Sequence, residues 1–145
     1  MTLSSAVYFI DANVPMYAAG SEHPLKEPCL CILRAVAKHE LSATTDVQVL
    51  QEILHRYSAM GERGRAREIV ELFMTVVPHV LAVTAADFIL ALKLHADYPV
   101  LQARDSLHAA TMQNHDIRHI VSADRHFDAV PTLSRVDPLF WVPAS

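Results

Sequence analysis

The sequence predicts an α/β fold with a central, mainly parallel sheet. Short, almost wholly apolar segments alternate along the chain with longer segments that carry apolar residues at helical spacing, and this alternation is typical of strand–helix–strand units. Two of the apolar segments, 6–10 and 119–123, run directly into Asp11 and Asp124. Buried parallel strands have this continuous apolar character, so both observations favour the same architecture.

Local signals place the first elements. The strand 6–10 precedes Asn13 and Pro15, which we expect to cap a helix and to occupy its first turn. Prolines and acids open a second helix at 25–39. The further expected elements are a strand at 41–44, helices at 47–60 and 66–76, a strand at 79–83, a helix from the Thr84–Asp87 capping box to Ala96, a helix from Asp105 to about Asn114, a strand at 119–123 and a short strand near 133–136.

The helix 47–60, which Thr45 or Asp46 would cap, contains one acid of special interest. Its apolar stripe is expected to pack on the sheet and consists of Val47, Leu50, Ile53, Leu54 and Tyr57. Glu52 lies roughly 150° from the centre of that stripe. A solvated charge, or a helical ion pair with Arg56, is the ordinary interpretation of such a position.

Length and composition indicate one domain spanning residues 1–145. The chain is 52% hydrophobic and has three glycines, with no low-complexity tract or repeat, so it is large enough to bury its own core. Its apolar stretches are shorter than the ~18 residues of a membrane span, and residues 1–5 lack the basic start of a secretory signal. We therefore expect a cytoplasmic protein without a membrane partner.

The charges and metal-binding side chains narrow the functional classes. Cys29 and Cys31 would point about 200° apart on a helix, which favours small core hydrophobes of a reducing compartment over a disulfide. The nine histidines form no HExxH motif, so zinc is not expected. The net charge of −4 gives no general attraction to nucleic acid, and any such partner would need a local basic patch.

Acids that follow neighbouring parallel strands meet at one edge of the sheet, even when they lie far apart in sequence. Asp11 and Asp124 have this placement. Clustered carboxylates repel one another and ionise readily only around a hard cation. The sequence therefore indicates a Mg²⁺ or Mn²⁺ site and an enzyme that acts on phosphates.

Four segments together resemble the motifs of the PIN-domain ribonucleases, in the same order along the chain. They are Phe9-Ile10-Asp11-Ala12-Asn13, Val49-Leu50-Gln51-Glu52-Ile53, Arg104-Asp105-Ser106-Leu107-His108-Ala109 and Ser122-Ala123-Asp124-Arg125-His126-Phe127-Asp128. The compact length resembles the VapC-type toxins of bacterial toxin–antitoxin pairs. The resemblance implies a three-layer α/β/α fold with four to five strands, a Mg²⁺- or Mn²⁺-dependent endoribonuclease, a homodimer and a cognate antitoxin.

The resemblance also implies site residues. The matching acids, expected to position the ion, are Asp11, Glu52, Asp105 and Asp124. Water activated by the ion would then hydrolyse a phosphodiester and leave a 5′-phosphate and a 3′-hydroxyl. Each acid has a simpler alternative: Asp11 a helix cap, Asp105 a complement to the helix dipole, Glu52 a surface charge. Asp128 either binds a second ion or structures its loop.

Other residues near the motifs have supporting roles in this hypothesis. We expect Asn13 to cap its helix and brace Asp11, and Ser122 or Thr45 to orient a ligand or a water, although capping also explains Thr45. His55, His108 and His126 are expected at the surface or behind the ligands. The candidate RNA-binding residues are Arg56, Arg63, Arg65, Arg67, Arg104 and Arg125.

Other functional classes fit less well. A phosphatase of the haloacid dehalogenase type needs a second Asp where this chain has Asn13, and a receiver domain needs paired acids and a later Lys that the sequence does not offer. The more serious alternative is a catalytically silent PIN-like module that binds RNA or a protein. Such a module would be free to lose acids, yet all four are present.

Overall fold

Five parallel strands form the centre of the protein, as a computed structural model that describes residues 6–141 shows. The sheet has the order β3-β2-β1-β4-β5, and every neighbouring pair is parallel. The strands are β1 Tyr8–Ile10, β2 Ala43–Asp46, β3 Val80–Leu81, β4 His119–Val121 and β5 Ser134–Val136. The predicted parallel α/β architecture is confirmed; the other strands are shorter than expected, whereas β2 has four residues but begins at Ala43 and not at Leu41.

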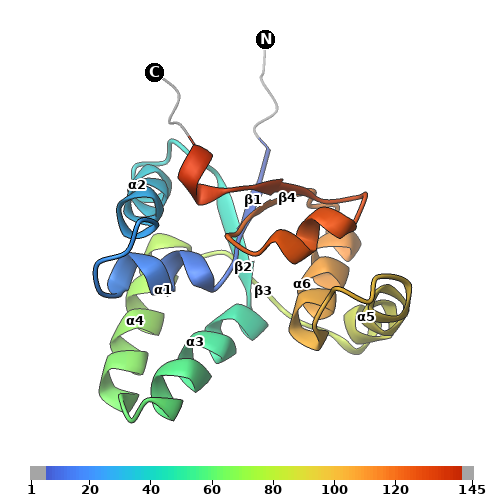
Figure 1. Cartoon of the computed structure of the whole chain (residues 1–145), viewed down its shortest axis with the longest axis horizontal. Helices are drawn as coiled ribbons and strands as arrows, with labels where there is room; N and C mark the ends of the chain where they lie inside the picture. Colours follow the sequence, from blue (N-terminus) through green and yellow to red (C-terminus); the bar gives the residue numbers. More distant parts are fainter. Residues whose placement is uncertain (1–5, 142–145) are drawn as a thin grey trace.

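Six α-helices connect the strands and cover the sheet in a three-layer α/β/α arrangement (Figure 1). They are α1 Asn13–Ala19, α2 Lys26–Ala37, α3 Val47–Ala59, α4 Arg63–Val76, α5 Ala85–Asp97 and α6 Ala103–Asn114; short 3₁₀ helices follow at Arg125–Ala129 and Pro138–Phe140. The first four helices gather together, whereas α5 packs on α6 as a separate pair. Among residues 6–141, no helix is long and apolar enough to cross a membrane.

The two strands that lead into the acids are buried on both faces. Phe9 and Ile10 of β1, and Ile120 and Val121 of β4, are fully buried, because helices cover the sheet on each side. This burial explains their uninterrupted apolar sequence. It also fixes where the polar residues after each strand emerge, since β1 and β4 are direct neighbours.

The predicted apolar stripe of α3 is wrong in its orientation. Val47 and Leu54 are 51% and 46% exposed, whereas Val49, Ile53 and Tyr57 are buried. Exposed apolar side chains are common, because proteins have too little polar surface to cover themselves. Including Val47 and Leu54 in the predicted stripe therefore shifted its centre away from the face that is buried. With the buried face corrected, Glu52 lies at its border: its side chain is only 13% exposed.

Several local predictions meet a mixed outcome. The capping box is confirmed, with Thr84 and Asp87 exchanging hydrogen bonds of 2.8 and 3.2 Å. Asn13 is not a cap: Ala12 holds that position and Asn13 is the first helical residue, with its side chain turned elsewhere. Cys29 is buried as expected, but Cys31 is exposed, because the two side chains point to different faces of α2.

A pair of valines tests the corrected face of α3. Val49→Ala should lower the free energy of unfolding by about 2–3 kcal/mol, since two buried methyl groups are lost and a cavity remains. Val47→Ala should change it by less than about 0.5 kcal/mol. Urea denaturation of both variants measures the difference. A larger loss for Val47→Ala than for Val49→Ala would mean that α3 packs through the stripe predicted from the sequence.

Candidate active site

The four acids line one pocket at the carboxyl end of the strands. Asp11 follows β1 directly, Asp124 lies just beyond β4, Glu52 comes from the middle of α3, and Asp105 from the first turn of α6. The pocket has a volume of about 400 Å³ and is also lined by Asn13, Met16, Tyr17, Arg56, Tyr57, Met60, Arg104 and Ala123. Residues spread over more than a hundred positions thus converge, as the parallel topology predicts.

Asp11 is the most firmly held of these acids. It is 5% exposed, its Oδ1 accepts from the backbone N–H of Ala12 at 2.8 Å, and its Oδ2 accepts from Ser122 Oγ at 2.6 Å and from Asn13 Nδ2 at 3.2 Å. Ser122 Oγ in turn accepts from the backbone N–H of Asp124 at 3.0 Å. The ends of β1 and β4 are therefore joined through the carboxylate of Asp11.

Of the two other predicted supporting residues, one lies at the pocket and the other does not. Asn13 reaches across to β4, donating to Ser122 Oγ at 3.0 Å and accepting from the backbone N–H of Ala123 at 3.2 Å. Its side chain thus braces Asp11 as expected. Thr45 is fully buried and donates to the backbone carbonyl of Ile10 at 3.0 Å. It ties β2 to β1 and does not line the pocket, while Asp46 caps α3.

Asp105 and Asp124 form a second pair of acids. Asp105 is 2% exposed, and its Oδ2 accepts from the backbone N–H of Gln102 at 3.1 Å. His126 lies between the pair, with Nδ1 3.6 Å from Asp105 Oδ2 and 3.2 Å from Asp124 Oδ1. The first turn of α6 therefore places a buried carboxylate beside Asp124.

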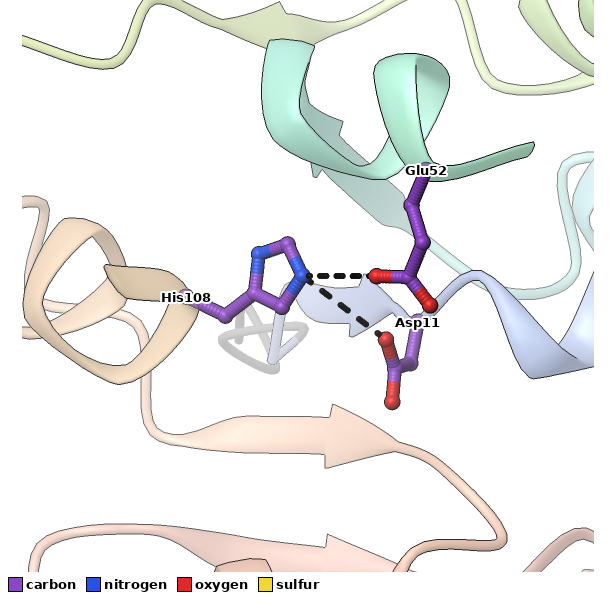
Figure 2. A group of neighbouring side chains, drawn as sticks. All are labelled: Asp11, Glu52 and His108. Atoms are coloured by element: carbon purple, nitrogen blue, oxygen red, sulfur yellow. Dashed lines mark ion pairs between the residues drawn. The ribbon is translucent and has the colours of Figure 1, made fainter. Parts of the chain in front are cut away.

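His108 lies at the centre of a second group of side chains, and the sequence prediction missed its position. It is 1% exposed, with Nδ1 2.9 Å from Asp46 Oδ2. Its Nε2 points between Glu52 Oε1, 3.7 Å away, and Asp11 Oδ1, 4.0 Å away (Figure 2). Its spacing of three residues from Asp105 on one helix was the available signal.

Burial makes two of the acids reluctant to ionise. It raises the pKa of Asp11, and His108 and Ser122 offset only part of that effect. It also raises the pKa of Asp105, and the neighbouring charge of Asp124 adds to the rise. Without a cation, full ionisation of this pocket therefore costs folding free energy.

Neighbouring charges also shift the pKa values of Glu52 and His108. Burial acts to raise the pKa of Glu52, but His108 and Arg104 outweigh it and hold that pKa below its usual value. Burial also disfavours a charged His108, yet Asp46, Glu52 and Asp11 outweigh it and raise the pKa of the imidazole to about 10. The acids around His108 thus favour the charged form of its imidazole.

The donor atoms fit a divalent cation. Each of two groups, Asp11–Glu52–His108 and Asp105–Asp124–His126, offers ligand atoms within 4.8 Å of one another. In the described part of the chain, Glu52 Oε1, His108 Nε2 and His126 Nδ1 are buried without a hydrogen-bond partner. Unpaired buried polar atoms are costly, and an ion would satisfy them. Carboxylates with an imidazole suit Mn²⁺, and the carboxylates alone suit Mg²⁺.

The structure does not bring Asp128 to these acids. Asp128 is exposed, lies outside the pocket lining, and both its oxygens accept from Arg135 at 2.8 and 3.2 Å. The sequence spacing suggested that it follows Asp124 around one turn. Because the intervening helix is 3₁₀, with three residues per turn, residues four apart do not share a face.

Only two of the predicted RNA-binding arginines lie at the pocket. Arg56 and Arg104 line the pocket. Arg63 and Arg67 line a separate hollow, where Arg67 Nε donates to Glu71 at 2.6 Å. Arg65 bonds the carbonyl of Ala19 and lies 5.9 Å from the ring of Tyr57, and Arg125 is exposed near Asp128. The arginines near the turn between α3 and α4 are therefore less available to bind RNA than the sequence implied.

Comparison with known proteins places these features in a family. Residues 8–133 match the PIN domain. The VapC ribonuclease Mb1869c of Mycobacterium bovis is 37% identical over 127 residues, 88% of this chain and 97% of the relative. Ribonuclease VapC23 of Mycobacterium tuberculosis is 34% identical over 116 residues, 80% of this chain and 91% of the relative.

Solved structures share the fold at lower identity. VapBC2 from Rickettsia felis, bound to a DNA fragment from its promoter, superposes with a TM-score of 0.72 at 16% identity, covering 90% of this chain and 97% of that one. VapC20 of Mycobacterium tuberculosis, a toxin that cleaves the sarcin–ricin loop, gives 0.70 at 18% identity, covering 86% and 95%.

The electrostatics of the metal-free pocket predict an unusual stabilising substitution. An acid whose folded pKa is raised costs no stability below its unfolded pKa and costs most above its folded pKa. Asp105→Asn, measured with chelator at pH 7, should therefore raise the melting temperature, and the gain should vanish near pH 3.8, the ordinary pKa of Asp. The amide oxygen keeps the bond to Gln102.

Asp128→Asn is the matched control for this melt. Arg135 lowers the pKa of Asp128, so its ionised form stabilises the fold above the unfolded pKa. Its loss should lower the melting temperature at pH 7. If Asp105→Asn also lowered the melting temperature, this would contradict the conclusion that ionised Asp105 destabilises the folded protein in the absence of a cation.

Proposed function

The chain belongs to the PIN-domain family and, within it, to the VapC-type ribonucleases, and from this we propose that it is a Mg²⁺- or Mn²⁺-dependent endoribonuclease and the toxin of a toxin–antitoxin pair. The observation that carries the proposal is the convergence of Asp11, Glu52, Asp105 and Asp124 on one pocket. All four carboxylates are retained, which favours catalysis over a silent binding module.

In the proposed mechanism, these four acids hold the catalytic ion or ions. A bound divalent ion supplies a nucleophilic water at neutral pH and offsets charge on the departing oxygen. Ser122 and Ala12 fix both oxygens of Asp11, so little reorganisation is needed when substrate binds. Attack of water on phosphorus breaks the bond to the 3′-oxygen and leaves a 5′-phosphate and a 3′-hydroxyl.

Arg56 and Arg104 are the proposed phosphate contacts, since they line the same pocket. Arg104 also lies 3.7 Å from Glu52, which holds its guanidinium toward the acids. Each phosphate contact to single-stranded RNA contributes about 0.7 to the slope of log affinity against log salt. Loss of Arg56 should flatten that slope, whereas loss of the Glu71-paired Arg67 should not.

An apolar groove on the other side of α1 is the proposed site of the antitoxin. It lies between α1, α2 and α4, has a volume of about 240 Å³, and is lined mainly by Pro15, Ala18, Ala19, Leu30, Leu33, Ala37, Ile69, Leu72, Phe73 and Val76. Leu72 is 66% exposed there. Such a groove favours a partner segment with apolar side chains. Toxin–antitoxin complexes among the structures that share this fold support that choice.

The homodimer stays a prediction. One face of α5 exposes Phe88, Ile89 and Leu92 at 54%, 68% and 58%, and a second copy would cover this apolar surface. Sedimentation equilibrium of the free protein measures the mass. A monomer at high micromolar concentration would rule out this assembly.

A single oxygen-to-amide change tests the catalytic proposal. Asp11→Asn should reduce RNA cleavage by about a hundredfold or more, because even residues that only support a metal ligand are worth 10–100-fold. Chelator should abolish wild-type cleavage, and Mg²⁺ or Mn²⁺ should restore it. Asp128→Asn is the control and should cleave at nearly the wild-type rate. Wild-type cleavage by folded Asp11→Asn would refute the site.

The groove is tested by two substitutions on the same helix. Leu72→Asp should abolish binding of the proposed cognate antitoxin, because it places a charge in the apolar groove. Met74→Asp, at a site 42% exposed and outside the groove lining, should leave binding intact. Isothermal titration calorimetry with purified antitoxin compares them. Cleavage of RNA should be unaffected in both, since neither residue lies at the pocket.

A further inference from the structure

We propose that His108 is a ligand, through Nε2, of the ion held by Asp11 and Glu52, and that Asp46 is the positioning residue that aims it. The inference rests on the proposed function, because it concerns the ion of that same pocket. It also goes further, since an imidazole ligand makes Mn²⁺ or a similar transition-metal ion, rather than Mg²⁺, the preferred occupant of this site.

The ring of His108 has one fixed orientation. Its Nδ1 lies 2.9 Å from Asp46 Oδ2, and its ring is tilted by 50° to that of Phe9, with 5.4 Å between the ring centroids. Asp46 is itself fully buried and held, because its Oδ1 accepts from the backbone N–H of Val49 at 2.8 Å. Neither ring rotation nor solvent access is available, so Nε2 must face the acids.

The distances around Nε2 suit a shared ion better than a hydrogen bond. Nε2 lies 3.7 Å from Glu52 Oε1 and 4.0 Å from Asp11 Oδ1 (Figure 2), both too long for a hydrogen bond of about 2.7–3.2 Å. Ligand atoms about 2.1 Å from one ion lie about 3.0 Å apart when adjacent and about 4.2 Å apart when opposite in an octahedral arrangement, and both distances lie between these limits. Of the three buried side-chain atoms without a hydrogen-bond partner in residues 6–141, Nε2 and Oε1 are two, and His126 Nδ1 is the third.

Asp46 selects the form of His108 that binds metal. A buried carboxylate only accepts hydrogen bonds, so Nδ1 carries a proton and the lone pair for an ion is on Nε2. This is the carboxylate–histidine–metal arrangement, in which the carboxylate fixes the tautomer and strengthens the ligand. An ion would need the lone pair of Nε2 free of its proton, so ion and proton would compete for that atom.

Pulsed electron paramagnetic resonance of bound Mn²⁺ tests the ligand directly. A coordinated imidazole nitrogen modulates the electron spin echo, so wild-type protein should show ¹⁴N modulation. His108→Asn should lose it, while its amide N–H still reaches Asp46. His126→Ala removes the other histidine near the acids and should keep it. Modulation that is absent from the wild type, or lost only in His126→Ala, would overturn the assignment.

Asp46→Asn tests the positioning role. The amide oxygen still caps α3, but the amide N–H now donates to Nδ1 and moves the ring proton to Nε2. Affinity for Mn²⁺, measured by calorimetry, should fall about 10–100-fold, and affinity for Mg²⁺ should fall less, so the preference for Mn²⁺ narrows. An unchanged ratio of the two affinities would contradict the proposal.

These experiments distinguish a failure of the ligand assignment from a failure of the proposed function. If wild-type protein cleaves RNA only with metal but shows no ¹⁴N modulation, the function stands and His108 is not a ligand. If Mn²⁺ binds with ¹⁴N modulation but RNA is not cleaved, the ligand assignment stands and the nuclease proposal fails. Circular dichroism melts in chelator establish that each variant is folded before its metal affinity is compared.

Discussion

Repulsion between carboxylates buried at one edge of the sheet is the constraint on which the site depends. Asp11 and Asp105 are almost fully enclosed, and burial raises the pKa of both. The surrounding groups counter that repulsion: the Ser122 hydroxyl, the backbone N–H groups of Ala12 and Gln102, and the imidazole of His108. A divalent ion would complete this compensation, which links the cost of folding the pocket to its affinity for metal.

The parallel topology of the sheet brings the acids together at one edge. β1 and β4 are neighbours with the same direction, so Asp11 and Asp124 emerge at one edge although more than a hundred residues separate them. α3 and α6 then contribute Glu52 and Asp105 from opposite helical layers. The core of fully buried strand residues holds the edge rigid, and the acids need no loop rearrangement to meet.

Local sequence predicted those parts of the site that depend on one element at a time. The ends of the strands were visible in the pattern of apolar residues, and the capping box in the spacing of Thr84 and Asp87. Glu52 followed only from the family motif, because exposed Val47 and Leu54 obscured the buried face of α3. The pairing of His108 in α6 with Asp46 at the end of β2 spans 62 positions, and no local pattern encodes such a contact. For Asp128 the sequence left a second-ion ligand and a loop contact open, and the 3₁₀ turn after Asp124 with the bonds to Arg135 agrees with the loop contact.

Anomalous X-ray diffraction from crystals soaked in Mn²⁺ tests the central claim most directly, because it locates the ion without reference to activity. We expect an anomalous peak in the pocket, within about 2.0–2.3 Å of carboxylate oxygens of Asp11 and Glu52. A saturated crystal of cleavage-competent protein with no peak among the four acids, or with its ion bound elsewhere, would contradict this account of the site.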